Sequence, residues 1–321
     1  MKEIPAFSLI LSEITVFKQF PYLCRMNSNH KAGFISIIGK PNVGKSTLMN
    51  QLVGERLSII TSKAQTTRHR IMGIVNGEQD GQEFQLVYSD TPGIIKPQYE
   101  LHNSMMEFVH GSLEDADVIL FVTDIFEKYD EEDVIEKLGK SEAPVLLIIN
   151  KVDLAREEQI EEKIDHWKSI INPRQILTIS ALEGFGIDSV LRHIVELLPV
   201  HPPYFPKDSL TDKPERFFAA EIIREKILQN YKKEIPYSCE VVITEFKEDD
   251  EIIRMMAEIY VERSTQRAIL LGHKGERIKK VGTEARLAME EFFQKKVFLQ
   301  QYIKVEPDWR LKRDKLKKFG Y

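Results

Sequence analysis

Cysteine is almost absent from this 321-residue chain, and so are long apolar runs. The two cysteines, Cys24 and Cys239, are too few for a disulfide framework and lack the spacing of metal ligands. No apolar stretch is long enough to cross a membrane, and no internal repeat or low-complexity segment is visible. A composition of 42% hydrophobic and 30% charged residues is typical of a globular protein and excludes a disordered one. We therefore expect a folded protein of the reducing cytoplasm.

The first 30 residues lack the features of a secretory signal. Their apolar character is interrupted by Glu3, Glu13 and Lys18, and no small-residue cleavage site follows. The residues from Met26 onward run directly into the first predicted strand. We interpret residues 1–30 as a dispensable N-terminal extension, or as the result of a start site upstream of the true one.

The charge of the chain is unevenly distributed. The formal net charge is −5, yet the segment from Arg263 to Tyr321 has 16 Lys and Arg against 7 Asp and Glu. A basic block on an acidic protein favours a polyanionic partner for that end, although a solvated charged helix would give the same composition. The length of 321 residues is sufficient for two domains of ordinary size.

The segment from Gly39 to Ser46 matches the phosphate-binding pattern Gly-x-x-x-x-Gly-Lys-Ser/Thr. The apolar run at 34–38 predicts a buried strand before it, and residues 47–52 predict the opening of a helix after it. Glycines let backbone N–H groups turn toward phosphate oxygens at a helix N-terminus, where the dipole favours negative charge. Lys45 is predicted to reach the β- and γ-phosphates, and Ser46 to bind Mg²⁺. The segment therefore predicts a nucleotide site.

The segment 90–93, Asp-Thr-Pro-Gly, follows the predicted strand 84–89. Asp90 is expected to hold Mg²⁺ through water, and the Gly93 N–H to approach a γ-phosphate because no Cβ intervenes. Between this segment and the phosphate loop lies the polar stretch Thr61 to Arg70. A threonine here is expected to bind Mg²⁺ only while the γ-phosphate is present; we choose Thr67, with Thr66 the close alternative.

The segment 150–153, Asn-Lys-Val-Asp, follows the predicted strand 145–149 and indicates guanine specificity. The Asp153 carboxylate can accept from guanine N1–H and the 2-amino group together, whereas adenine offers neither donor. Lys151 can lay its stem across the base, and Asn150 can tie neighbouring loops together. The segment 180–182, Ser-Ala-Leu, follows strand 176–179 and can address guanine O6 through its backbone N–H groups. These segments occur in the order of a GTP-binding domain.

Strand candidates in this part of the chain lie at 33–38, 84–89, 118–123, 145–149 and 176–179, with helical patterns between them. The near-continuous apolar runs at 118–122 and 145–149 are typical of strands covered on both faces, so we predict an α/β domain with a mostly parallel sheet flanked by helices. The prolines at 199–206 and Pro214 predict a semi-rigid spacer. We place a GTPase domain at 31–198 and a linker at 199–214.

Beyond the linker the pattern is α+β. A helix is predicted over 215–230, strands over 239–244 and 252–261, a long helix ending near Phe293, and a strand over 297–305. This order is that of the type II KH fold, with Gly272-His273-Lys274-Gly275 as its Gly-x-x-Gly loop. The exposed N–H groups of such a loop, with Lys274, can clamp a nucleic-acid backbone. We assign 215–306 to a KH domain.

The remaining residues, 307–321, form a basic tail that begins near Trp309. This tail could extend an RNA contact, with Trp309 stacking on a base, while packing of Trp309 in the core is an equal alternative. A membrane-surface role for the tail ranks lower because the basic block adjoins a KH fold.

With these motifs in place, the chain resembles the Era-like family of bacterial ribosome-assembly GTPases. The resemblance covers residues from about Lys31 to Tyr321, and its most specific part is Lys63-Ala64-Gln65-Thr66-Thr67-Arg68. It implies GTP/GDP and Mg²⁺ as cofactors, and it implies binding of the KH domain to the 3′ end of 16S rRNA in the small (30S) ribosomal subunit. We also expect slow GTP hydrolysis, and nothing in the sequence suggests anything other than a monomer.

The position after Gly93 is Ile94, where many small GTPases have a glutamine that orients water. The resemblance points instead to Asn42, which in related GTPases helps hold a K⁺ ion against the phosphates. K⁺ is therefore a candidate cofactor.

The candidate residues form four sets. Those expected to act in catalysis are Lys45, Asn42, Thr67 and Gly93. Those expected to bind nucleotide are Gly39, Lys40, Pro41, Asn42, Val43, Gly44, Lys45, Ser46, Thr47, Asp90, Thr91, Pro92, Gly93, Asn150, Lys151, Asp153, Ser180, Ala181 and Leu182. The metal set is Ser46, Thr67 and Asp90. The RNA set is Gly272, His273, Lys274, Gly275, Arg277, Lys279 and Lys280.

We predict a GTP-hydrolysing switch that acts on the small ribosomal subunit. Two alternatives stay open: an RNA-binding scaffold in which nucleotide serves structure alone, and a signalling GTPase peripheral to the inner face of the membrane.

Overall fold

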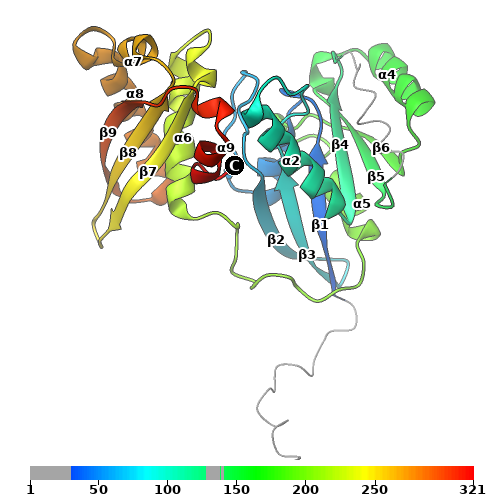
Figure 1. The fold of residues 1–321 in the computed structure, drawn as a ribbon. Helices are drawn as coiled ribbons and strands as arrows, with labels where there is room; N and C mark the ends of the chain where they lie inside the picture. Colours follow the sequence, from blue (N-terminus) through cyan, green and yellow to red (C-terminus); the bar gives the residue numbers. More distant parts are fainter. Residues whose placement is uncertain (1–29, 128–137, 139–140) are drawn as a thin grey trace, which may run out of the picture.

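The computed structural model describes residues 30–127, 138 and 141–321, so the predicted extension lies outside the described residues apart from His30. The described strands form two sheets, one in each half of the chain. Helix α9 (Arg313–Lys318) and the C-terminus lie between the two halves (Figure 1). Within the described residues, no helix is both long and apolar enough to cross a membrane.

The described strands of the first half form a six-stranded sheet in the order β2-β3-β1-β4-β5-β6, and among them β2 alone runs antiparallel to its neighbour. Its strands are β1 (Lys31–Ile38), β2 (Ile71–Gln79), β3 (Gln82–Asp90), β4 (Val118–Asp124), β5 (Val145–Asn150) and β6 (Gln175–Thr178). Its described helices are α1 (Lys45–Val53), α2 (Glu100–Glu114), α4 (Glu157–Ile170) and α5 (Ile187–Leu197). The predicted α/β class is confirmed.

Strands β4 and β5 begin with unbroken apolar runs, as suits strands that helices cover on both faces of the sheet (Figure 1). On one face Ile37 of β1 packs in the same core as Leu48 of α1 and Ile194 of α5. On the other face Phe121 of β4 meets Trp167 of α4, with ring centroids 5.3 Å apart in an edge-to-face arrangement. Because β1, β3, β4, β5 and β6 are parallel, their carboxyl ends lie at one edge of the sheet. This is the edge where α/β sheets bind their ligands.

Strand β2 was not among the predicted strands. It is an antiparallel edge strand whose residues are largely half-exposed, so it has no continuous apolar run. The signal that could have found it is the hairpin dipeptide Asp80-Gly81, whose φ angles of 52° and 78° suit a two-residue turn.

Residues 199–214 are fixed along the edge of the first sheet. The Gln85 side chain donates to Phe205 O at 2.8 Å and accepts from the N–H groups of Tyr204 and Phe205 at 2.7 and 2.9 Å. The Ile74 N–H donates to Leu210 O at 2.8 Å. These bonds to β2 and β3 determine where the second half of the chain begins.

The second half has the element order α6 (Glu215–Asn230), β7 (Cys239–Glu248), β8 (Ile252–Val261), α7 (Ser264–Leu271), α8 (Glu276–Phe293) and β9 (Lys296–Val305). Strand β8 is central, antiparallel to β7 and parallel to β9. Ile223 of α6 and Val281 and Met289 of α8 pack in one core with the sheet. The predicted type II KH fold is confirmed.

The tail is packed between the halves. Trp309 is 0% exposed, and its Nε1–H donates to Ser238 O at 3.1 Å. Leu316 of α9 and Trp309 lie in the same core cluster as Leu101 of α2. The core alternative for Trp309 is therefore correct and the base-stacking one is wrong, because burying the large indole beside α2 leaves no face of it for a nucleobase.

Candidate functional site

A cavity of about 520 Å³ lies at the carboxyl edge of the first sheet. Segments that are far apart in the sequence meet there. Its wall contains Pro41, Asn42, Gly44, Lys45, Ser46, Thr47, Thr66, Thr67, Gly93, Asn150, Lys151, Asp153, Ser180, Ala181 and Leu182. The remaining predicted nucleotide residues, Gly39, Lys40, Val43, Asp90, Thr91 and Pro92, are not part of this wall. Several of these residues accept hydrogen bonds from residues of the wall.

The phosphate loop takes its shape from two glycines. Gly39 has φ 150°, and a Cβ there would lie 2.1 Å from Val122 O. Gly44 has φ 98°, and a Cβ there would lie 2.2 Å from Asn150 Nδ2. Both positions therefore require glycine, one to approach β4 and the other to approach β5.

Lys45 points back into this loop. Its Nζ donates to Gly39 O at 3.0 Å and to Lys40 O at 2.8 Å. Burial lowers the pKa of the Lys45 ammonium to about 8, although the charges of Asp90 and Glu127 act in the opposite direction. A buried ammonium held by neutral carbonyls gains most from an anion, so Lys45 suits contact with phosphate oxygens.

Ser46, Thr67 and Asp90 come together as predicted for a metal site. Ser46 Oγ donates to Asp90 Oδ2 at 2.7 Å and lies 2.9 Å from Thr67 Oγ1. The Asp90 carboxylate is fully buried, and its Oδ1 has no hydrogen-bond partner among the described residues. Burial raises the pKa of this carboxyl, against the hydrogen bond from Ser46. Two hydroxyls and a carboxylate with an unused oxygen fit a hard divalent cation.

The guanine-side motif is joined to the phosphate loop through Asn150. Its Nδ2 donates to Val43 O at 2.8 Å, and its Oδ1 accepts from the N–H groups of Lys151 and Ala181 at 2.8 and 2.9 Å. Lys151 Nζ lies 2.6 Å from Asp124 Oδ2. Because the Ala181 N–H is held by Asn150, a contact of that N–H with guanine O6 would have to be shared with Asn150.

Replacing Asn150 by alanine is expected to weaken nucleotide binding and to destabilise the fold. The change leaves buried backbone groups of Val43 and Ala181 without partners, each at a cost of about 1–3 kcal/mol. We expect a lower denaturation midpoint together with a loss of GDP affinity on the order of tenfold or more. Denaturant unfolding with and without GDP measures both effects. Unchanged GDP affinity would contradict the role given to Asn150.

Ile94, which replaces the water-orienting glutamine, is 5% exposed and packs in the apolar cluster of α2. Its N–H donates to Gly39 O at 3.0 Å. It therefore serves as a backbone link to the phosphate loop, and its side chain cannot orient water.

The Gly-x-x-Gly loop joins α7 to α8 as a short turn. Gly272, Lys274 and Gly275 have φ angles of 70°, 48° and 81°. Gly275 caps the N-terminus of α8, where the helix dipole favours a phosphate. The side chains of His273 and Lys274 are exposed, as are those of Arg277, Lys279 and Lys280 on the first turns of α8.

A second basic feature adjoins this loop. A cavity of about 480 Å³ is lined by Arg277 and Lys280 of α8 and by Lys232 and Lys233, which follow α6. The exposed Ile269 supplies an apolar wall. Lys232 and Lys233 were not predicted; the paired lysines at the end of an apolar helix were the signal. The cavity combines positive charge with an apolar surface, as binding of single-stranded nucleic acid requires.

Comparisons with known proteins support the assignment of both halves of the chain. The profile of the family described as 50S ribosome-binding GTPase matches residues 34–151, and that of the KH domain matches residues 234–310. GTPase Era of Syntrophus aciditrophicus (strain SB) is 45% identical over 91% of this chain and 95% of its own length. The chloroplastic GTPase ERA1 of Zea mays is 43% identical over 92% of this chain and 71% of its own.

Two crystal structures of Era superpose on most of this chain. One contains MgGDPNP and nucleotides 1506–1542 of 16S ribosomal RNA; it has a TM-score of 0.86 and 39% identity, and covers 91% of this chain and 99% of that one. The other is an Aquifex aeolicus Era variant bound to GDP and AlF4−, with a TM-score of 0.84, 39% identity and the same shares covered.

A phosphate loop and a guanine motif at the edge of one sheet, followed by a KH domain, define a GTPase that carries an RNA-binding domain. Its sequence identity to GTPase Era extends over nine tenths of the chain and over nearly all of the bacterial relatives. The chain belongs to the Era family of GTPases.

Proposed function

We propose that this protein is a GTP-hydrolysing switch that binds the 3′ region of 16S rRNA and acts in assembly of the 30S subunit. The observation that carries the proposal is the presence of a guanine-nucleotide cavity and a basic, partly apolar KH cavity in one chain. The Era structure with a TM-score of 0.86 holds a GTP analogue and 16S rRNA nucleotides together.

In this proposal GTP or GDP occupies the cavity of the first domain with Mg²⁺. Lys45 and the loop N–H groups bind the phosphates, and Gly93 lets the backbone approach the γ-phosphate. Ser46, Thr67 and Asp90 hold Mg²⁺, which supplies positive charge at the phosphates. Asp153 selects guanine. Turnover is slow because Ile94 cannot orient the attacking water.

Asn42 is proposed to hold K⁺. Its side chain lies against the loop that carries Thr67, with Nδ2 3.2 Å from Ser62 O. The Asn42 side-chain oxygen and the Ser62 carbonyl are neutral oxygen groups of the kind that bind a monovalent cation. We expect GTP hydrolysis to be roughly tenfold or more faster in K⁺ than in Na⁺, and Asn42→Ala to remove that difference. Equal rates in both salts, or a K⁺ effect that survives in the variant, would refute this assignment.

The RNA set, Gly272, His273, Lys274, Gly275, Arg277, Lys279 and Lys280, is proposed to contact RNA together with Lys232 and Lys233. The protein is proposed to act as a monomer in the cytoplasm, where the ribosomal subunit is assembled. A peripheral membrane role gains little support from the tail, because Trp309 and Leu316 are buried and Leu311 is its one largely exposed apolar side chain.

Crosslinking to small-subunit rRNA in the GTP-bound and GDP-bound states tests the proposal. We expect crosslinks from α8 and the loop after α6 to the 3′ region of 16S rRNA, with a yield that depends on the nucleotide. A structural nucleotide would give the same yield in both states and no GTP turnover, even with ribosomal subunits and K⁺ present. Crosslinks confined to other RNA regions would contradict the proposed partner.

A further inference from the structure

The stretch from Thr61 to Arg70, here called the threonine loop, is hydrogen-bonded to the second domain. Some of these bonds are donated by the loop and others by the second domain. From the loop, Lys63 Nζ donates to the carbonyls of Leu228 and Tyr231 at the end of α6. From α6, the Arg224 guanidinium donates to Thr66 O. The loop that carries the proposed Mg²⁺ ligand is thus held by groups outside the GTPase domain.

Arg68 enters the second domain more deeply. It is 1% exposed and donates to Cys239 O at 2.8 Å, to Glu240 Oε2 at 3.0 Å, and to Tyr237 O at 3.1 Å. Tyr321 closes this contact: its hydroxyl donates to Glu240 Oε2 at 2.7 Å.

His69, the next residue of the loop, lies under the Tyr321 ring, with ring centroids 4.2 Å apart. Phe217 of α6 packs edge-on against the same imidazole at 5.6 Å. Burial lowers the pKa of His69, so the ring is neutral at pH 7 and packs as an aromatic group.

Arg224 is itself fixed before it reaches the loop. Its Nε and one terminal nitrogen bind the two oxygens of Glu221 at 2.7 and 2.6 Å, and both side chains are buried. Burial acts to lower the pKa of Arg224, but the charge and hydrogen bonds of Glu221, together with the charge of Glu240, outweigh it and the pKa is raised. A forked guanidinium pinned in this way holds its remaining N–H groups in one direction.

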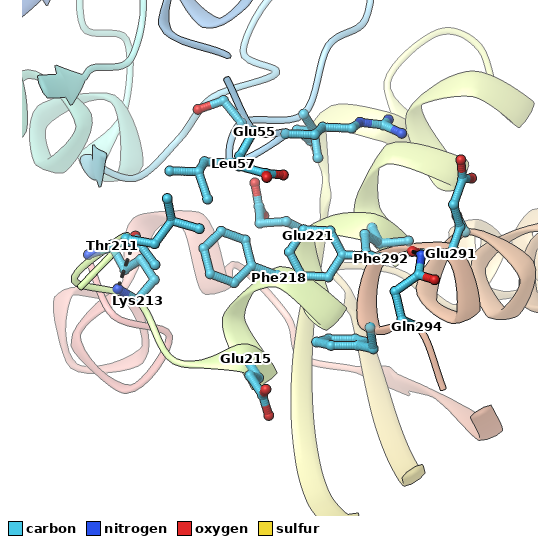
Figure 2. A pocket seen from close by; sticks show the side chains of 17 residues that line it. Glu55, Leu57, Thr211, Lys213, Glu215, Phe218, Glu221, Glu291, Phe292 and Gln294 are labelled. Carbon is cyan, nitrogen blue, oxygen red and sulfur yellow. Dashed lines mark hydrogen bonds between the residues drawn. The ribbon is translucent and has the colours of Figure 1, made fainter. Parts of the chain in front are cut away.

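The junction between the domains is hollow next to the threonine loop. A cavity of about 740 Å³ lies between the domains beside α6. Figure 2 shows side chains of both domains facing it, among them Leu57 of the first domain and Phe218, Glu221 and Phe292 of the second. Beside this hollow, the second domain docks through buried charged contacts at the threonine loop and through the apolar packing of Trp309 and Leu316 beside α2.

Both chain neighbours of Thr67 are held by the second domain. The carbonyl of Thr66 is held by Arg224, and the side chain of Arg68 is held by the second domain. Between them, Thr67 Oγ1 lies 2.9 Å from Ser46 Oγ. We infer that Arg224 is a positioning residue for GTP hydrolysis, which from the second domain orients Thr67 toward the Mg²⁺ site. This inference rests on the proposed role of Thr67 as a Mg²⁺ ligand in the GTP-bound state.

The test compares affinities of the full chain for GDP and for a non-hydrolysable GTP analogue, both with Mg²⁺. The variant is Glu221→Met/Arg224→Met, which removes both charges together so that neither is left buried and unpaired. Because Thr67 is used only with a γ-phosphate, we expect analogue affinity to fall by about tenfold while GDP affinity stays unchanged. We also expect hydrolysis to require more Mg²⁺.

Arg224→Lys is a second variant that keeps a charge beside Glu221, but a single ammonium cannot make the forked contact to Glu221 and reach Thr66 O at the same time. It is expected to show the same selective loss. The matched control is Arg56→Met, which breaks another ion pair across the same junction, with Glu225 at 2.5 Å, without contacting the threonine loop. It should keep the wild-type ratio of analogue to GDP affinity.

Equal losses for both nucleotides in the Arg224 variants would mean a merely structural role and would overturn the inference, as would unchanged affinities. If the wild-type protein bound the analogue equally well with and without Mg²⁺, the proposed role of Thr67 would fall, and the inference with it. Mg²⁺-dependent binding in the wild type with no effect in the variants would overturn the inference alone.

Discussion

Replacing Asp153 by asparagine is expected to change the preferred base from guanine to xanthine. In the proposed function the Asp153 carboxylate accepts hydrogen bonds from guanine N1–H and the 2-amino group, and asparagine cannot accept both. Its amide can instead accept from xanthine N1–H and donate to the oxygen at position 2. We expect GTP affinity to fall on the order of 10⁴-fold, since a site built for hydrogen bonds strongly rejects a mismatched partner.

Competition of GTP and XTP against a fluorescent nucleotide measures this exchange. Asp165→Asn makes the same chemical change at an exposed position on α4 and should leave both affinities unchanged. An Asp153→Asn protein that keeps its preference for GTP would show that the base is read elsewhere.

The second large effect is expected for Gly44→Ala in the phosphate loop. The new Cβ would lie 2.2 Å from Nδ2 of Asn150, at a residue with φ 98°. The left-handed conformation costs a residue with a Cβ about 1–2 kcal/mol, and the clash would displace either the loop or Asn150. We expect GDP and GTP affinities to fall together by about 10²-fold or more, as measured by calorimetry.

Gly54 provides a matched control for that experiment. It ends α1 with φ 80°, and a Cβ there would meet no atom within 4 Å. Gly54→Ala therefore has the same backbone strain without the clash. It should lower stability slightly and leave nucleotide affinity unchanged. Equal effects of the two substitutions on affinity would show that strain, and not the contact with Asn150, decides the result.

The gathering of the candidate nucleotide residues around one cavity could be predicted in large part from the sequence, since each motif follows a strand whose end faces the same edge. The contact of Asn150 with Val43 and Ala181 follows from that topology. Strand β2 could not be found from apolar runs because an edge strand is only half covered. The fold of the second domain followed from its element order, even though Gly-x-x-Gly is a weak signal by itself.

The junction between the domains could not be predicted, for a physical reason. Arg68 and Arg224 are charged residues, so the local sequence predicts exposed side chains. Burial of these side chains becomes favourable only when partners far along the chain are present. Arg68 finds its partners about 170 residues away, at Cys239 and Glu240. Trp309 similarly depends on Ser238 and α2 for its environment. Contacts of this range leave no periodic pattern in the sequence.

The proposed switch requires the GTP site and the RNA site to be linked, and the threonine loop is the proposed connection. The most direct measurement is a titration of the full chain with a GTP analogue, with and without an oligonucleotide from the 3′ end of 16S rRNA, and the converse titration. Linkage requires the RNA to change analogue affinity by the same factor as the analogue changes RNA affinity. We predict equal factors of about fivefold or more, which fall toward one in the Glu221→Met/Arg224→Met protein. Affinities that are independent of each other in the wild-type protein would contradict the account.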